Sequence, residues 1–226
     1  MEEFERTERI FGKENIEKLL LKKVIIFGVG GVGGYVAEML ARTGIGHITL
    51  VDFDIVSKSN INRQIVALQS TIGQNKVDVM KQRILDINPT CNINIINGKL
   101  VKENIDEFNL RNYDYVADCI DMVESKVALI KYCYENNIDC LSAMGAGNKC
   151  EIPHFVIKDI FNTSYDGLAK VLRKKLREEN VKNHNVVICE QESLNCNPIG
   201  SVVYYPAMCG CVLSAKIVKD LLNQNN

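Results

Sequence analysis

The chain has 226 residues, of which 46% are hydrophobic and 24% are charged. This balance is typical of a globular protein and excludes both intrinsic disorder and a collagen-like repeat. Lysine and arginine total 27 against 28 acidic residues, a net charge of −1, so no global positive field attracts nucleic acid. Any contact with nucleic acid would have to use a local basic patch.

Two features of the sequence bear on where the protein works. The first six residues are largely charged and lack the apolar core of a secretory signal. The longest largely apolar stretch, residues 202–215, is interrupted by Pro206 and Gly210 and is too short to span a bilayer. We therefore expect a soluble protein of the cytoplasm.

The nine cysteines form no Cys-x-x-Cys motif, and two such pairs are the minimum for the usual zinc knuckle. Most lie within apolar strand or helix patterns, so we expect reduced and mostly buried thiols. Cys189 and the pair Cys209 and Cys211 are the candidate nucleophiles. Because none of the three histidines stands near them in the sequence, a catalytic cysteine is disfavoured.

The first 150 residues alternate between short β-branched runs and helical patterns. Strands are predicted at residues 24–27, 47–51, 92–96, 113–119 and 138–143. Helices are predicted after the glycine run at 28–34, and at 75–87 and 125–134. Strands separated by helical crossovers imply an α/β fold with a Rossmann-like, doubly wound, mostly parallel sheet.

The pattern changes after Gly145. Short strands are predicted at residues 155–157 and 186–188, on either side of a basic helix within 164–177. A further strand is predicted at 201–205 and a closing helix at 209–222. We assign residues 1–150 to a core with an N-terminal arm and residues 151–226 to a strand and helix extension of the same domain.

A glycine-rich run follows the first strand and opens a helix; it contains Gly28, Gly30, Gly31 and Gly33. Glycines let the backbone approach a nucleotide closely, and the helix N-terminus offers unpaired N–H groups to phosphate. Asp52, at the end of the second strand, stands where an acidic residue binds ribose hydroxyls. These features alone indicate a nucleotide, with NAD as the default.

The polar segment after Asp52 favours ATP over NAD. It carries Arg63, and Lys76 begins the next helix. Two fixed cations suit a triphosphate whose pyrophosphate must leave. Asp121 follows the fourth strand, at the sheet edge where doubly wound folds bind ligands, and its carboxylate is a ligand type that Mg²⁺ accepts. An NAD-linked oxidoreductase and a catalytically silent scaffold are the alternatives from this segment.

Taken together and in order, these motifs resemble the ubiquitin-activating-enzyme-like (ThiF/MoeB-type) superfamily. They include Leu-Ala-Arg-Thr-Gly-Ile-Gly at 40–46, Ser-Asn-Ile-Asn-Arg-Gln at 59–64 and Gly-Gln-Asn-Lys at 73–76. The resemblance implies an adenylate-forming, ligase-type enzyme that uses ATP and Mg²⁺, with residues 1–150 as its ATP-binding core. It implies catalytic roles for Arg63, Lys76 and Asp121, the last also holding the metal. The nucleotide would be bound by Gly28, Gly30, Gly31, Gly33, Asp52, Asp54, Ser59, Asn60, Asn62 and Gln64.

Within that superfamily the chain looks most like the tRNA threonylcarbamoyladenosine dehydratase branch, through Arg-Ile-Phe-Gly at 9–12, residues 40–46 and the basic segment 164–177. This branch implies adenylation of the threonyl carboxylate of a modified tRNA, followed by cyclisation with release of AMP. It also implies a homodimer in which Arg9 reaches the partner subunit's ATP, and it leaves room for a cysteine-desulfurase-type partner. The alternative, adenylation of the C-terminal glycine of a ubiquitin-like sulfur carrier, is disfavoured by the missing Cys-x-x-Cys pairs.

The basic helix supplies the local patch that the net charge requires. Four cations at spacing i, i+3, i+4 and i+7 share one face: Lys170, Arg173, Lys174 and Arg177. The apolar stripe predicted beside them consists of Leu168, Val171, Leu172 and Leu176. No aromatic residue is interleaved, so the expected contact is with tRNA backbone phosphates rather than with stacked bases. A solvated amphipathic helix is the alternative.

Overall fold

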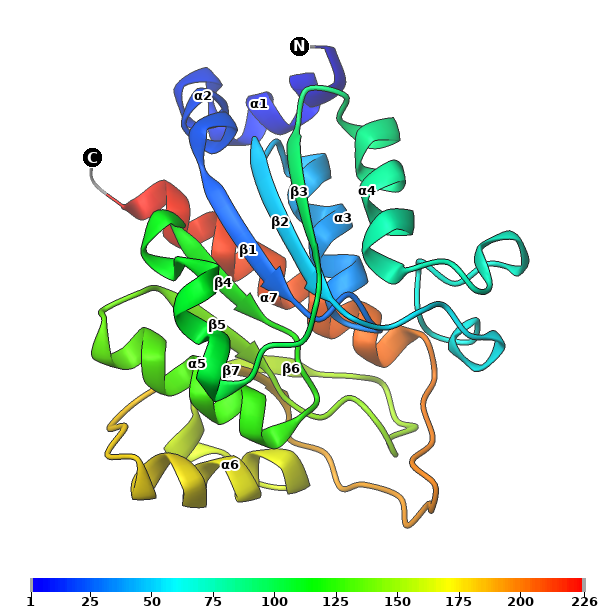
Figure 1. The fold of residues 1–226 in the computed structure, drawn as a ribbon, viewed down its shortest axis with the longest axis vertical. Helices are drawn as coiled ribbons and strands as arrows, with labels where there is room; N and C mark the ends of the chain where they lie inside the picture. Colours follow the sequence, from blue (N-terminus) through cyan, green and yellow to red (C-terminus); the bar gives the residue numbers. More distant parts are fainter. Residues whose placement is uncertain (1, 225–226) are drawn as a thin grey trace.

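The computed structural model describes residues 2–224. Its centre is a seven-stranded sheet in the order β3-β2-β1-β4-β5-β7-β6 (Figure 1). Only the pair β6 and β7 is antiparallel, so the predicted α/β, mostly parallel sheet is confirmed. The strands are β1 (Lys23–Phe27), β2 (His47–Asp52), β3 (Asn92–Asn97), β4 (Tyr115–Asp118), β5 (Cys140–Ala143), β6 (Phe155–Asp159) and β7 (Asn185–Cys189).

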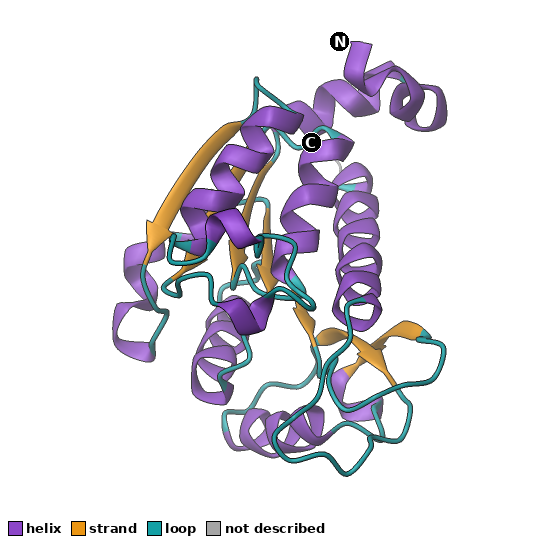
Figure 2. Cartoon of the chain, turned by 90° about the vertical axis from the view of Figure 1, so that its right-hand side faces the viewer, coloured by secondary structure: helices purple, strands orange, loops and turns teal. Residues whose placement is uncertain are grey.

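Helices cover both faces of this sheet (Figures 1 and 2). The helices are α1 (Glu5–Phe11), α2 (Lys13–Leu21), α3 (Gly33–Thr43), α4 (Lys76–Ile87), α5 (Val123–Glu135), α6 (Gly167–Glu178) and α7 (Tyr204–Asn223). Side chains alternate along a strand, so Val24 and Ile26 of β1 pack toward α3, α4 and α7, whereas Ile25 and Phe27 pack toward α5. All four are buried, which accounts for the apolar run that predicted this strand.

The two short helices α1 and α2 make up the predicted N-terminal arm. Phe4, Ile16 and Leu19 are buried and join the core cluster that contains α3 and α7. The arm therefore packs on the amino edge of the sheet, away from the edge where the strands of the core end. Within residues 2–224, no helix is long and apolar enough to cross a membrane.

One predicted strand is wrong. Residues 201–203 form a loop, and Tyr204 begins α7, which therefore starts earlier than the predicted residue 209. Tyr205 is fully buried, with its hydroxyl 2.8 Å from the carbonyl oxygen of Glu151 and 2.9 Å from Oε1 of Gln191. Pro206 lies in the first helical turn, where its missing N–H removes no helical hydrogen bond. The β-branched run suggested a strand because local propensity ignores these tertiary contacts.

Four parallel strands of the core end at the same edge of the sheet. The glycine-rich loop follows β1, the polar segment 53–75 follows β2, residues 119–122 follow β4 and residues 144–154 follow β5. The order of the sheet brings these loops together although they are far apart in the sequence. Open α/β sheets bind their ligands at this edge.

Candidate nucleotide-binding site

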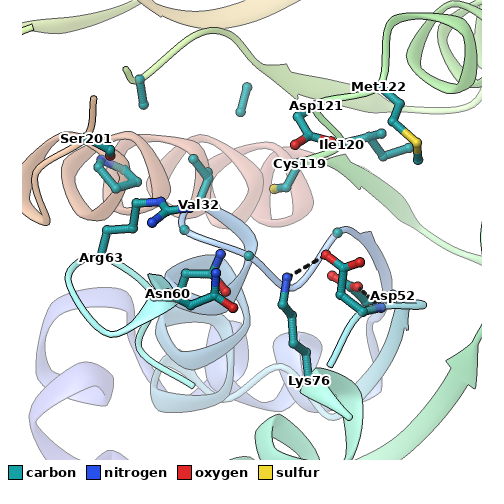
Figure 3. A pocket seen from close by; sticks show the side chains of 18 of the residues that line it. Val32, Asp52, Asn60, Arg63, Lys76, Cys119, Ile120, Asp121, Met122 and Ser201 are labelled. Carbon is teal, nitrogen blue, oxygen red and sulfur yellow. Dashed lines mark hydrogen bonds and ion pairs between the residues drawn. The ribbon is translucent and has the colours of Figure 1, made fainter. Parts of the chain in front are cut away.

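A cavity of about 960 Å³ opens at the carboxyl edge of the sheet (Figure 3). Its size is near the upper end of the ~300–1,000 Å³ range of small-molecule sites, so it has room for more than a mononucleotide. Most of the residues predicted to bind or act on ATP line it. They are Gly28, Gly30, Gly31, Asp52, Asp54, Ser59, Asn60, Asn62, Arg63, Gln64, Lys76 and Asp121.

Some predicted residues do not line this pocket. Gly33 is buried in the first turn of α3, behind the glycine loop. Arg9 is exposed on α1, where it pairs with Glu5 of the same helix. The four cations of α6 also lie outside the pocket, although Leu168 in the first turn of α6 lines it.

The loop after β1 is shaped by close backbone contacts. Gly28 has φ of +86°, and a Cβ there would lie 2.7 Å from the carbonyl oxygen of Cys119. Only glycine fits this conformation and this approach. Asp52 accepts the N–H of Val29 at 2.6 Å and the N–H of Asp54 at 2.8 Å. This buried carboxylate therefore ties the glycine loop to the end of β2, and its remaining lone pairs can accept hydroxyl groups.

Two cations reach the pocket from different segments. Lys76 begins α4, is buried, and places its Nζ 2.7 Å from Oδ2 of Asp54 (Figure 3). Arg63 donates from Nη1 to the carbonyl oxygen of Ser59 and to Oδ1 of Asn62, each at 2.8 Å. The Arg63 contacts are with neutral oxygens, so its positive charge stays available to an anion in the pocket.

The pocket also holds a buried polar atom without a partner. Among the described residues, Oε1 of Gln64 makes no hydrogen bond although the side chain is buried. Nearby, Oδ1 of Asn60 accepts the N–H of Ser57 at 3.0 Å and fixes the polar segment in place. An unsatisfied buried acceptor is costly, but this oxygen has almost no accessible surface, so a bound nucleotide does not reach it unless the side chain moves.

Asp121 is exposed at the mouth of the pocket, just beyond β4 (Figure 3). The turn that carries it is anchored by Asp118, whose Oδ1 accepts the N–H of Ile120 at 3.1 Å. Asp118 and Asp121 therefore have different roles, although both stand in one short acidic motif. Asp118 is a fully buried anchor, and Asp121 is the carboxylate that a ligand can reach.

Behind that turn lies a buried polar network. Oδ2 of Asp118 lies 2.7 Å from Nζ of Lys126, and both side chains are fully buried. Ser142 donates its hydroxyl to the same Oδ2 at 2.5 Å, so its oxygen accepts from Nε2 of His184 at 2.8 Å. The network joins β4, β5, α5 and the residue before β7, and it supports the acidic turn.

Stability should fall in mild acid because of His184. Burial, and then the nearby Lys126 ammonium, lower the pKa of this imidazole to about 3. In the unfolded chain this imidazole binds a proton near pH 6.5. The neutral imidazole therefore contributes its full stabilisation of the fold above that pH, and this stabilisation is lost as the pH falls toward 3. Between pH 7.5 and 5.0 the free energy of unfolding should drop by about 2 kcal/mol from this group. Urea denaturation of wild type and His184→Gln should show this slope flattened in the variant.

The matched control is His154→Gln, because His154 is exposed and lies outside the network. It should retain the wild-type dependence of stability on pH. Equal slopes for wild type and His184→Gln would contradict the assignment of the acid sensitivity to the network.

Sequence reasoning missed the far wall of the pocket. This wall comprises Ala143 at the end of β5, residues 144–147 after it, Leu168 of α6, residues 199–201 before α7, and Pro206. The turn-rich Gly145-Ala146-Gly147 break was the one available signal, because it follows a strand that ends at the ligand-binding edge. The remaining residues reach the pocket through tertiary contacts that no local motif encodes.

The thiols give little support to a catalytic cysteine. All nine cysteines are free; Cys150, Cys196 and Cys211 are exposed, so the prediction of mostly buried thiols fails for these three. Burial raises the pKa of Cys209 to about 12, and burial also raises that of Cys119, which lines the pocket. Both shifts disfavour the reactive thiolate.

The structure confirms a helix in the predicted basic segment 164–177, but the predicted apolar and cationic faces of this helix need correction. The apolar stripe of α6 consists of Ala169, Leu172 and Leu176, which are buried, whereas Val171 is exposed. Arg173 is partly buried and donates to the carbonyl oxygen of Thr163. Three cations on this helix remain exposed to solvent: Lys170, Lys174 and Arg177.

The parallel sheet carries at its carboxyl edge a glycine loop, the cations Lys76 and Arg63, and Asp52, an acidic residue of the kind that binds ribose hydroxyls. This combination is typical of nucleotide-binding α/β proteins. The family model for the ThiF family matches residues 4–226. The chain therefore belongs to the ThiF family.

Similar proteins include two tRNA threonylcarbamoyladenosine dehydratases and one adenylyltransferase. The tRNA threonylcarbamoyladenosine dehydratase of Bacillus subtilis is 39% identical over 242 residues, covering 98% of this chain and 95% of that protein. The structure of the Escherichia coli tRNA N6-threonylcarbamoyladenosine dehydratase in complex with ATP is 34% identical, with a TM-score of 0.94 over 98% of this chain and 94% of that one. A molybdopterin-synthase adenylyltransferase of Haemophilus influenzae is 32% identical, covering 91% and 79% of the two chains.

Proposed function

We propose that this protein is an ATP-dependent dehydratase that acts on threonylcarbamoyladenosine in tRNA. The observation that carries the proposal is the pocket itself. It places Arg63 and Lys76 beside the glycine loop, and it offers Asp52 as an acceptor for a nucleotide. The high similarity to the tRNA-modifying dehydratases supports this substrate class over a sulfur carrier. An enzyme of tRNA modification is expected to work in the cytoplasm.

The proposed reaction activates a carboxylate and then closes a ring. The threonyl carboxylate of the tRNA attacks the α-phosphate of ATP, giving an acyl-adenylate and pyrophosphate. An atom of the substrate's own carbamoyl group then attacks the activated carbonyl and expels AMP. Because this attack is intramolecular, the protein needs no nucleophilic cysteine. In this scheme Asp52 orients the ribose, and Arg63 and Lys76 stabilise negative charge as the pyrophosphate leaves.

The pocket fits Mg²⁺ at Asp121. Magnesium is commonly bound through one or two carboxylates together with the phosphates of a nucleotide. Asp121 is an exposed carboxylate at the pocket edge, and the buried Asp118 fixes its turn. When bound, the metal would neutralise negative charge on the phosphates, and Asp121 would hold and orient the metal.

We also propose that the active form is a homodimer. Arg9 is exposed on α1 and does not line the pocket of its own chain, so a catalytic role would require a second copy to bring it near ATP. Sedimentation should give the mass of two chains, and a monomer that retains activity would contradict the role of Arg9. A cysteine-desulfurase-type partner stays a prediction.

The exposed cations of α6 support contact with the tRNA backbone. Leu168 in the first turn of α6 lines the pocket, and Lys170, Lys174 and Arg177 follow on the same helix. A tRNA whose modified nucleoside enters the pocket would therefore pass its backbone over these side chains. Since Arg173 is engaged with Thr163, the other three are the expected phosphate contacts.

Replacing Lys170, Lys174 and Arg177 together by glutamine should weaken tRNA binding and leave the affinity for ATP nearly unchanged. Each lost phosphate contact should flatten the slope of log affinity against log salt by roughly 0.7–0.9. Salt titrations of tRNA binding measure this slope. The control replaces Lys18, Lys23 and Lys219, which are exposed and lie outside α6 and the pocket. An unchanged tRNA affinity in the α6 variant would contradict the proposal and favour the alternative, in which α6 is a solvated amphipathic helix.

The decisive experiment is conversion of tRNA in vitro. Purified protein, ATP, Mg²⁺ and tRNA carrying threonylcarbamoyladenosine should yield a product lighter by one water, together with AMP and pyrophosphate. Mass spectrometry of the nucleosides detects the product. Formation of an adenylate on a ubiquitin-like carrier protein, with no change in the tRNA, would favour the alternative activity.

A further inference from the structure

The far wall of the pocket differs in character from the nucleotide side. Most of its side chains are apolar, with Met144, Leu168 and Ile199 facing the cavity. Asp52 and Lys76 lie at the other end of the pocket from Ser201 (Figure 3). With the ribose assigned to Asp52 at the opposite end, this wall is the part of the cavity that we assign to a second reactant.

A single residue holds this wall together. Asn148 has the left-handed φ of 56° and makes four hydrogen bonds with the segment 194–200. Its N–H donates to the carbonyl oxygen of Gly200 at 2.8 Å, and its Oδ1 accepts the N–H of Gly200 at 2.6 Å. Its Nδ2 donates to the carbonyl oxygen of Cys196 at 3.0 Å, and its carbonyl oxygen accepts the N–H of Leu194 at 2.6 Å.

The segment 194–201 also packs closely against the loop after β5. A Cβ at Gly147 would lie 2.6 Å from Cγ2 of Ile199 and 3.1 Å from the carbonyl oxygen of Gly200, so a larger residue would displace this segment. On the nucleotide side, Nδ2 of Asn62 donates to the carbonyl oxygen of Ser201 at 3.0 Å. The segment is therefore fixed at both ends, between the loop after β5 and the polar segment that carries Arg63.

We propose that Asn148 is a positioning residue, and that the part of the wall it holds, residues 199–201, packs against the modified adenosine of the tRNA. This inference rests on the proposed function. A purine with a threonyl side chain is flat and partly apolar, which suits the exposed Ile199 and the neighbouring Leu168. Leu168 also begins the helix that carries the exposed cations, so nucleoside and backbone contacts are continuous.

Asn148→Gly tests the role of the side chain because glycine keeps the left-handed backbone and removes two of the four hydrogen bonds. It should raise the KM for tRNA at least tenfold, reduce kcat less, and leave the Kd for ATP within twofold of wild type. The matched control is Asn137→Gly, on an exposed asparagine with φ of 53° in the turn before β5. The control should show wild-type values for all three constants.

A second variant keeps the test decisive if Asn148→Gly folds poorly. Ile199 is 78% exposed, so Ile199→Asp should fold normally. It should also raise the KM for tRNA while the Kd for ATP stays unchanged. Ile152→Asp is the control, because Ile152 is 87% exposed and lies outside the pocket.

The outcomes separate this inference from the proposed function. If wild type converts the tRNA and Ile199→Asp has a wild-type KM for tRNA, the assigned contact between this wall and the modified adenosine is wrong. The proposed function would still hold. Loss of ATP affinity in either variant equal to the change in KM would also overturn the assigned contact, because the wall would then serve the nucleotide. No conversion by wild type would overturn both.

Discussion

Lys76→Met should lower the rate of ATP-dependent tRNA conversion by on the order of 100-fold or more. In the proposed mechanism, the buried ammonium of Lys76 beside the glycine loop is a fixed charge that stabilises the departing pyrophosphate better than solvent does. Methionine keeps the hydrocarbon stem and removes the charge. Single-turnover kinetics at saturating ATP measure the loss, and Arg63→Ala should show a loss of the same order.

The fold should survive this change. The Asp54 side chain, which pairs with Lys76, is 49% exposed, so its carboxylate stays hydrated when the lysine is lost. The urea midpoint should therefore move little. Lys81→Met is the control, because Lys81 lies on the same helix and outside the pocket. A near wild-type rate for Lys76→Met would refute the assigned phosphate site.

Lys126→Met should lower the free energy of unfolding by about 3–5 kcal/mol. The substitution leaves Asp118 fully buried without its cation, and a buried uncompensated charge costs far more than the pair contributes. The double variant Lys126→Met with Asp118→Asn removes both charges, so it should recover much of the lost stability. Equilibrium urea denaturation measures all three proteins.

An exposed ion pair supplies the control for this prediction. Lys131 lies 2.6 Å from Glu179, but its side chain is 30% exposed. Lys131→Met should cost far less than Lys126→Met, since surface pairs are screened by water. If Lys126→Met were no more destabilising than Lys131→Met, the buried network would not be the support of the acidic turn that we infer.

The strands and the crossover helices of the core follow from local patterns. The runs around β1 and β2 are apolar because both faces of these strands are covered by helices, and that burial is visible in the sequence. Pro89 marks the end of α4, which stops at Ile87 as the pattern predicts. For segments of this kind, the periodicity of hydrophobic residues was sufficient to predict the strand or helix.

The nucleotide side of the pocket was predictable for a related reason. The glycine loop, Asp52, Lys76 and Asp121 each follow or precede a strand or helix end, and parallel strands bring their carboxyl ends to one edge. Residue type and position along the strand therefore determined the site. Their placement in one cavity agrees with that reasoning.

Other features depended on contacts between distant segments. The network joins Asp118 of β4, Ser142 of β5 and His184 before β7, and each residue alone reads as an ordinary polar position. Asn148 holds a segment that follows it by about fifty residues, and no spacing rule connects the two. Tyr205 lies in the first turn of a helix where the sequence suggested a strand, because its hydroxyl donates to the carbonyl oxygen of Glu151 in another loop.

The sequence by itself determined the parallel sheet and its nucleotide edge, because strand burial and glycine turns are local consequences of residue type. Only the tertiary structure decided the far wall, the buried network and the start of α7. In these places the free energy comes from hydrogen bonds and packing between segments far apart in the chain, which local propensity does not contain.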